Sequence, residues 1–106
     1  MNKLTETEYA QSLDELRYLF AWVLIRYGKF SPEKARIETL TKFPYESDNQ
    51  PFRDLIFHEE AWHWAMLFLH GEGYWEAFPQ YVQIPDDYRK TEDLLFQKQL
   101  KFSDLF

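Results

Sequence analysis

The apolar pattern of residues 9–27 constrains the fold more than any other feature of the sequence. Apolar and aromatic side chains recur there at spacings of three and four, which places them on one face of an α-helix. They are Tyr9, Leu13, Leu16, Phe20, Val23, Leu24 and Tyr27. From Tyr18 onward the segment YLFAWVLI is apolar around most of its circumference. This half of the helix is therefore predicted to be central, with neighbours on more than one side.

Capping signals predict where this helix begins and ends. The segments TETE at 5–8 and SLDE at 12–15 both match the capping box, in which two side chains bond reciprocally to free backbone N–H groups. The helix is expected to begin at Thr5 or to break near Ser12. Gly28 is well placed as the residue just past its end.

Two further helices are predicted by similar signals. The segment FSPEKARIETLTKFP offers Ser31 as an N-cap and Pro32 at the first helical position. Pro44 ends this helix, because the residue before a proline disfavours helical geometry. A third helix is predicted over 51–70, and it stops at Gly71.

The remaining residues have a weaker pattern. Two prolines and many aromatic rings interrupt any helical pattern in residues 72–88. The segment TEDLLFQKQLKF predicts a short last helix from about Thr91. No convincing strand is found, and 106 residues suit one domain. The sequence therefore predicts a single all-α domain over residues 1–106, with three main helices and an aromatic-rich, partly irregular C-terminal segment packed on them.

Cysteine is absent from the chain, which excludes disulfide bonds, thiolate metal sites and a cysteine nucleophile. The first residues, MNKLTETEYAQSLDEL, lack the basic and then apolar layout of a signal peptide. The longest apolar run, from Tyr18 to Ile25, is far shorter than the roughly 20 residues that cross a bilayer. We expect a cytoplasmic protein with no membrane partner and no cofactor.

Charge is unevenly distributed along the chain. The formal net charge is −6, and no lysine or arginine occurs between Arg53 and Arg89. The acidic side chains in that interval are Asp54, Glu59, Glu60, Glu72, Glu76, Asp86 and Asp87. A surface of this kind repels a phosphate backbone, since nucleic-acid affinity rests largely on cationic side chains. The pattern predicts no nucleic-acid partner and favours a protein with a basic surface.

Histidines and carboxylates gather in residues 57–73, FHEEAWHWAMLFLHGEG. On one continuous helix, Glu59, His63 and His70 would align in a stripe. Carboxylate oxygens and imidazole nitrogens suit a divalent transition metal, so the stripe is a candidate metal site. The zinc-protease motif is excluded, because it needs histidines four residues apart and His58 and His63 are five apart.

A structural interpretation of the same stripe is favoured. The opposite side of the predicted helix is expected to form its core face. Its residues are Phe57, Ala61, Trp64, Ala65, Phe68 and Leu69. Glu59 and His63 would then be an i,i+4 pair on the less buried side. The nucleophile and phosphate-loop patterns of common enzymes are missing, so an enzyme is the less favoured class.

Aromatic rings are dense in residues 74–88, where Tyr74, Trp75, Phe78, Tyr81 and Tyr88 stand among acidic side chains. The candidate partner-binding residues are Glu72, Tyr74, Trp75, Glu76, Phe78 and Tyr81. Binding interfaces favour tryptophan and tyrosine, which bury a large rigid area and keep a polar group. The sequence predicts a small protein-interaction domain, of accessory, inhibitor or immunity type, that presents this acidic aromatic face to a protein partner.

The sequence leaves three alternatives open. The rings of 74–88 can simply cover the first and third predicted helices, because small domains use aromatic side chains for buried area. The aromatic face can also bury itself in a homodimer. A third alternative is a small metal-binding or ligand-binding enzyme that uses Glu59, His63 and His70.

Overall fold

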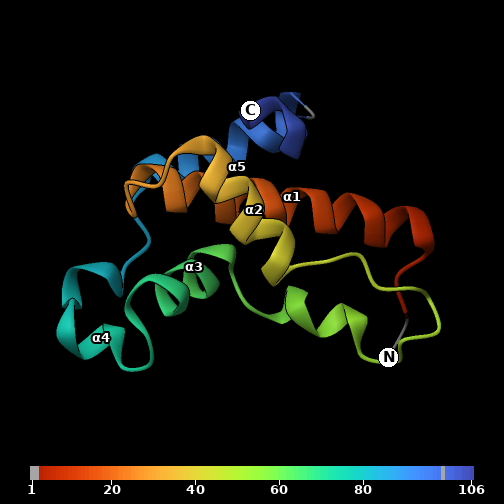
Figure 1. The fold of residues 1–106 in the computed structure, drawn as a ribbon, viewed down its shortest axis with the longest axis horizontal. Helices are drawn as coiled ribbons and strands as arrows, with labels where there is room; N and C mark the ends of the chain where they lie inside the picture. Colours follow the sequence, from red (N-terminus) through yellow and green to blue (C-terminus); the bar gives the residue numbers. More distant parts are fainter. Residues whose placement is uncertain (1–2, 99) are drawn as a thin grey trace.

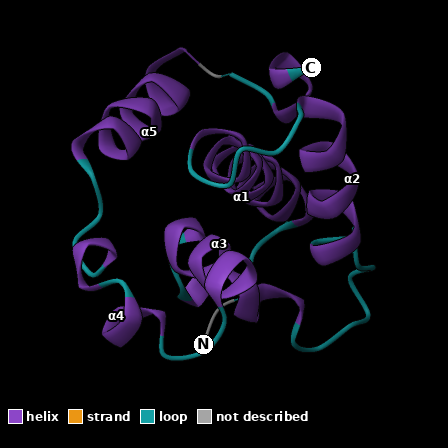
Figure 2. Ribbon diagram, turned by 60° about the vertical axis from the view of Figure 1, so that its left-hand side comes forward, coloured by secondary structure: helices purple, strands orange, loops and turns teal. Residues whose placement is uncertain are grey.

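Helix α1 lies in the middle of the protein, and the other long helices surround it (Figure 1, Figure 2). The computed structural model describes residues 3–98 and 100–106. The elements, with η for a 3₁₀ helix, are α1 (Glu6–Arg26), α2 (Pro32–Lys42), η1 (Arg53–His58), α3 (Ala61–His70), α4 (Tyr74–Ala77), η2 (Pro79–Tyr81), α5 (Asp86–Lys98) and η3 (Phe102–Leu105). The described residues contain no strand, which confirms the predicted all-α class.

Helix α1 begins where the first capping signal predicts. The Thr5 side chain accepts a hydrogen bond from the Glu8 N–H at 3.1 Å, and the Glu8 carboxylate accepts one from the Thr5 N–H at 2.8 Å. The first of these bonds satisfies a donor that the first helical turn leaves without a partner. The helix then continues through Ser12 without the alternative break.

Replacing Thr5 with alanine is expected to lower the free energy of unfolding by about 1 kcal/mol, because the Glu8 N–H loses its acceptor. Urea denaturation followed by circular dichroism measures this change. Thr7→Ala is the matched control, since Thr7 is exposed in the same turn and is not the cap. Equal losses in the two variants would contradict the assignment of Thr5 as the cap.

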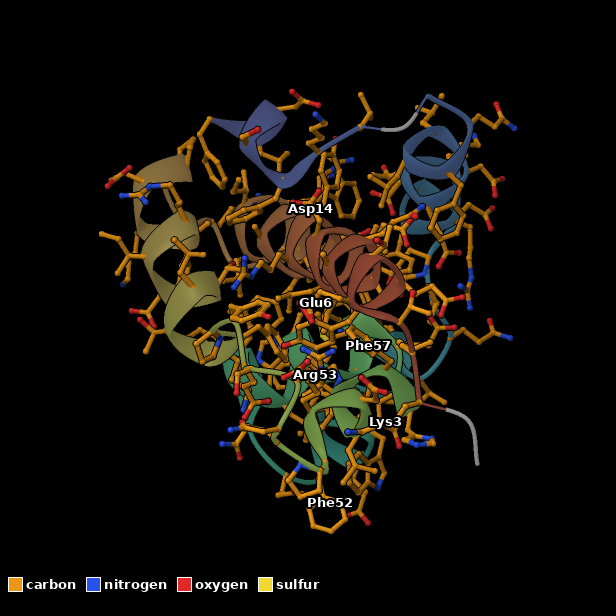
Figure 3. The ribbon with its side chains drawn as sticks, turned by 90° about the vertical axis from the view of Figure 1, so that its right-hand side faces the viewer. Lys3, Glu6, Asp14, Phe52, Arg53 and Phe57 are labelled. Carbon is orange, nitrogen blue, oxygen red and sulfur yellow. The ribbon has the colours of Figure 1, made fainter. Side chains whose placement is uncertain are left out.

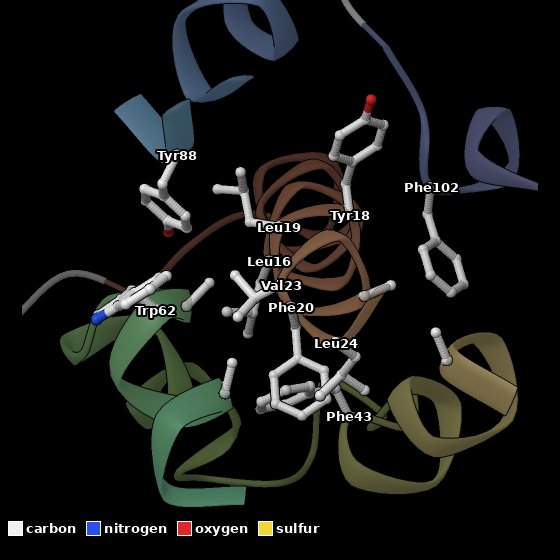
Figure 4. Close-up of a cluster of buried hydrophobic side chains, with 14 of the residues drawn as sticks. Leu16, Tyr18, Leu19, Phe20, Val23, Leu24, Phe43, Trp62, Tyr88 and Phe102 are labelled. Carbon is white, nitrogen blue, oxygen red and sulfur yellow. The ribbon is translucent and has the colours of Figure 1, made fainter. Parts of the chain in front are cut away.

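The second half of α1 is buried on several sides, as its composition predicts. Phe20, Ala21, Val23 and Leu24 are fully buried there. Figure 4 shows side chains of α1 meeting Phe43 below the helix, Trp62 and Tyr88 on one side and Phe102 on the other. One continuous core therefore joins α1 to all of its neighbours.

Gly28 follows α1 as predicted, but the reason for glycine is different. The left-handed backbone conformation falls on Lys29, with φ of 60°, and not on Gly28. A Cβ atom at Gly28 would lie 2.7 Å from the carbonyl oxygen of Leu24 and 2.8 Å from a methyl carbon of Leu69. Glycine is required there because the end of α1 approaches α3 closely.

Helix α2 matches the sequence prediction at both ends. The Ser31 side chain accepts a hydrogen bond from the Lys34 N–H at 3.2 Å, and Pro32 occupies the first helical position. The helix ends before Phe43, whose φ of −125° and ψ of 67° are not helical. The Phe43 ring is buried and packs edge-on against Phe20, with ring centres 5.0 Å apart.

The prediction of one unbroken helix over 51–70 is wrong. A 3₁₀ helix ends at His58, Glu59 and Glu60 are extended with ψ of 152° and 145°, and α3 starts only at Ala61. A continuous α-helix would use the carbonyl oxygen of Ile56 to accept the Glu60 N–H. The Trp64 indole N–H occupies that oxygen instead, at 2.9 Å. A tertiary contact thus replaces the helical bond at the break.

The predicted core face of this segment is only partly correct, since Ala61 and Ala65 are buried as expected but the largest buried side chains are others. Trp62 and Met66 are 2% and 0% exposed, whereas Phe68 is 38% exposed and Trp64 is only partly buried. Because the helix begins at Ala61, its orientation is set by packing on α1 and not by the phase of the residues before it. The Trp62 indole N–H donates to the Tyr81 carbonyl at 3.0 Å, which ties α3 to η2.

A buried arginine joins η1 to the start of α1 (Figure 3). Arg53 is 4% exposed and lies 3.8 Å from the centre of the Tyr9 ring. Its guanidinium donates to the Glu6 carboxylate at 2.9 Å and to the Glu46 carbonyl at 3.0 Å. The Tyr45 hydroxyl donates to the second Glu6 oxygen at 2.5 Å. This network fixes the 44–52 connector beside α1.

Glu6 makes the stability of this junction depend on pH. Hydrogen bonds from Tyr45 and Arg53 hold the pKa of Glu6 below its ordinary value of 4.5. A carboxylate of lowered pKa stabilises the fold above its ordinary pKa, and the contribution disappears as the pH falls through the folded-state pKa. Glu6→Gln is therefore expected to lower the urea midpoint at neutral pH, with a difference that narrows below pH 4.5. A difference independent of pH would contradict this account.

The C-terminal third is more helical than predicted and docks on α1. Helix α5 begins at Asp86 and not near Thr91, directly after a proline. The segment KFSDLF, whose conformation could not be predicted from its pattern, forms η3. The Phe102 N–H donates to the Asp14 carboxylate of α1 at 2.9 Å, and the Phe102 ring is 8% exposed.

Candidate binding cleft

The break between η1 and α3 borders an open cleft of about 360 Å³, where α1, α3 and α5 meet. Its apolar lining consists of Leu16, Leu19, Phe57, Ala61 and the Tyr88 ring. Its polar lining consists of Ser12, Glu15, His58, Glu59, Glu60 and Glu92. Segments far apart in the sequence therefore place carboxylates around an apolar floor.

Two of these carboxylates have a basic partner and two do not. The Arg89 guanidinium lies 3.3 Å from Glu60 and 2.9 Å from Glu92. Neither Glu15 nor Glu59 forms an ion pair with any residue whose side chain the structure describes. The pKa of Glu15 is raised by partial burial and by the nearby charge of Asp14. The cleft thus has negative charge that the protein itself does not neutralise.

A buried phenol hydroxyl belongs to one of the cleft residues. Tyr88 is 0% exposed, and its hydroxyl has no hydrogen-bond partner among the described residues. Burial raises the pKa of Tyr88, and the charges of Glu60 and Glu92 add to the shift. The backbone N–H of Trp62, which lies close to this oxygen, acts in the opposite direction. Figure 4 shows the hydroxyl directed inward, away from α5.

The predicted acidic aromatic face lies on α4 and η2, and its rings are unequally exposed. Tyr74 is buried, and its hydroxyl is 2.9 Å from Nδ1 of His63. Phe78 and Tyr81 are partly buried against the His70 ring, with ring centres 4.4 and 5.8 Å from it. Trp75 is 42% exposed. Trp75 is therefore the main ring that this face offers to a partner.

The acidic members of the predicted face are accessible. Glu72 and Glu76 are both exposed on either side of Trp75 in the chain. Glu59 lines the cleft and is also close to Tyr74. The pKa of Tyr74 is raised mainly by burial and, to a smaller extent, by the negative charge of Glu59. Glu59 therefore lies between the cleft and the Tyr74 side chain of α4.

The structure does not assemble the predicted metal stripe of Glu59, His63 and His70. Glu59 lies outside α3, so the helical alignment that motivated the stripe is lost. His63 and His70 share a helix face but are separated by seven residues, which is roughly 10 Å along the axis. Within residues 3–98 and 100–106, no three histidine, cysteine, aspartate or glutamate side chains are grouped to hold a metal ion.

Glu15, Tyr88 and Glu92 line the cleft but were not identified as site residues from the sequence. Tyr88, Glu92 and Leu95 have the spacing of one helix face, which is the local signal that could have indicated them. The spacing shows that they lie together on α5 but not that this face meets the break before α3.

No protein-family model, curated protein or solved structure matches this chain. Among the described helices, none has both the length and the apolar character needed to span a membrane.

Proposed function

We propose that the protein is a small protein-interaction domain, of accessory, inhibitor or immunity type, that binds a basic surface of another protein. The observation that carries this proposal is the exposed Trp75 on α4, which lies between the exposed carboxylates of Glu72 and Glu76 in the chain. Carboxylates of this kind attract a cationic surface over a long range and accept strong hydrogen bonds from its side chains. A partly exposed tryptophan supplies the apolar anchor that interfaces favour.

Site-specific photo-crosslinking tests this proposal. The photoreactive residue p-benzoylphenylalanine would replace Trp75 in the full chain, which is then expressed in cells of its source organism. A matched control carries the same residue at Ile37, which is 50% exposed on α2. Figure 2 shows α2 on the far side of α1 from α5.

The expected result is one predominant basic protein crosslinked through position 75 and not through position 37. The crosslink should weaken at high salt and on the double charge reversal Glu72→Lys and Glu76→Lys, because both changes reduce the electrostatic attraction. Equal crosslinking from both positions, or a partner retained after charge reversal, would contradict the proposed face.

A further inference from the structure

We infer that the groove between the first half of α1 and the end of α5 is a dimer interface, occupied by the same groove of a second copy of this chain. The two copies are related by a two-fold axis, so each contact between residues is made twice. The interface lies away from α4 (Figure 1), and it does not depend on the partner proposed for Trp75.

The groove has a volume of about 510 Å³ and is lined by α1, by α5 and by residues 100–101. Its apolar lining consists of Ala10, Leu95, Phe96 and Leu100. Leu95 is 1% exposed and belongs to the core, whereas Phe96 is 52% exposed. A large ring that is half open to solvent beside an apolar groove is suited to burial against another protein surface.

A second exposed ring extends the apolar surface near the groove. Phe106 is 44% exposed and packs on Phe102, with ring centres 5.0 Å apart. The Phe102 N–H donates to the carboxylate of Asp14, which lines the groove. Specific interfaces cover roughly 800 Å² on each partner, so a contact that begins in the groove must extend to surfaces of this kind.

Charges of both signs line the groove without forming an ion pair with each other. Asp14 and Glu15 belong to the α1 wall, and Lys101 belongs to the segment after α5. Neither Glu15 nor Lys101 forms an ion pair with any residue whose side chain the structure describes. Burial and the charge of Asp14 raise the pKa of Glu15, so a nearby cation would stabilise this carboxylate.

This charge pattern favours a second copy as the occupant. In a two-fold arrangement, Glu15 of each copy faces Lys101 of the other, and the Phe96 ring of each copy packs on the apolar lining of the other. A partner of uniformly basic surface would attract Glu15 but repel Lys101. A groove that carries both charges is instead complementary to itself.

Sedimentation equilibrium of the full chain over a range of concentrations tests the inference. We expect the mass to rise with concentration toward twice that of one chain. Phe96→Lys should weaken the dimer more than about tenfold, because it places a charge against an apolar surface. Phe52→Lys is the matched control and should leave association unchanged. Phe52 is the same residue type, is 72% exposed and lies at the opposite end of the protein from α5 and η3 (Figure 3).

A mixing experiment tests the pairing of Glu15 with Lys101. Glu15→Lys and Lys101→Glu should each weaken self-association about tenfold or more, because each change brings like charges together. An equimolar mixture of the two variants should recover the dimer, since both contacts of the mixed pair again join opposite charges. A loss of folding in either variant cannot produce this recovery.

A mass of one chain at every concentration, or association that persists in Phe96→Lys, would overturn the inference. A dimer abolished by Trp75→Lys but not by Phe96→Lys would place the interface on α4 and would also overturn it. Failure of the charge variants to recover on mixing would contradict the two-fold pairing on which the inference rests.

Photo-crosslinking in cells distinguishes a second copy from another occupant of the groove. With p-benzoylphenylalanine at position 96, we expect the chain to crosslink to a second copy of itself. A crosslink to a different protein in place of the second copy would show that a partner fills the groove, and it would overturn the inference. The crosslink through position 75 tests the proposed function separately.

Discussion

Replacing Trp62 with alanine is expected to lower the free energy of unfolding by about 3–5 kcal/mol, because the change removes a large buried ring and leaves a cavity. Trp62 is 2% exposed, and its ring packs edge-on against Tyr27 at 5.1 Å and Tyr88 at 5.8 Å. Its indole also holds η2 through the Tyr81 carbonyl. The alanine variant therefore loosens α3, η2 and α5 together. Urea denaturation measured by circular dichroism gives the loss.

Trp75→Ala is the matched control, because Trp75 is the same residue type at 42% exposure. It should cost less than about 1 kcal/mol, as most surface substitutions do. Comparing the losses in free energy of unfolding of the two variants also tests the orientation of α3. If Trp62→Ala cost no more than Trp75→Ala, the packing described for Trp62 would be wrong.

Replacing Gly28 with alanine is expected to lower the free energy of unfolding by about 1–3 kcal/mol, the usual cost of forcing extra volume into a packed site. The new methyl group would meet the Leu24 carbonyl at 2.7 Å, and a backbone atom cannot move aside cheaply. The Leu69 side chain at 2.8 Å could shift, so Leu69→Ala should recover only part of the loss.

Gly71→Ala distinguishes this steric cost from backbone strain. Gly71 has φ of 83°, and nothing lies within 4 Å of the position that a new methyl group would take, so its substitution strains only the backbone. Full recovery of Gly28→Ala stability by Leu69→Ala would contradict the contact with the Leu24 carbonyl. A stability of Gly28→Ala equal to that of the native chain would contradict the close approach altogether.

The parts of the fold that the sequence predicts correctly depend on contacts within a few residues. The cap at Thr5 bonds to Glu8, and the cap at Ser31 bonds to Lys34, each three residues away. Pro44 ends α2 by restricting its direct neighbour. The geometry of each such contact is set by neighbouring residues, so it can be predicted without knowledge of the rest of the protein.

The break before α3 could not be predicted in this way. Residues 51–70 have enough helical periodicity to suggest one rod, but the Trp64 indole occupies the Ile56 carbonyl that the rod requires. The buried Arg53 and its contacts with Glu6 and Tyr9 also hold η1 in place from outside the segment. These contacts decide where the helix starts and therefore which face is buried.

The same limit applies to the candidate site. The sequence indicated Glu59 because of a helical stripe, whereas the structure places Glu59 in a cleft because the helix is broken. Glu15 and Tyr88 reach that cleft from α1 and α5, which no local pattern relates to each other. The acidic interval between Arg53 and Arg89 indicated Glu59 and Glu60 without reference to the helical register, but Glu15 and Glu92 lie outside it.

Backbone chemical shifts of residues 53–70 test the account most directly, since the cleft exists only if the chain is extended at Glu59 and Glu60. We predict helical Cα shifts over 61–70, extended shifts at those two glutamates, and a Glu60 amide that exchanges rapidly with solvent. Uninterrupted helical shifts with a protected Glu60 amide would place Glu59 on a helix face and would contradict the cleft described between η1 and α3.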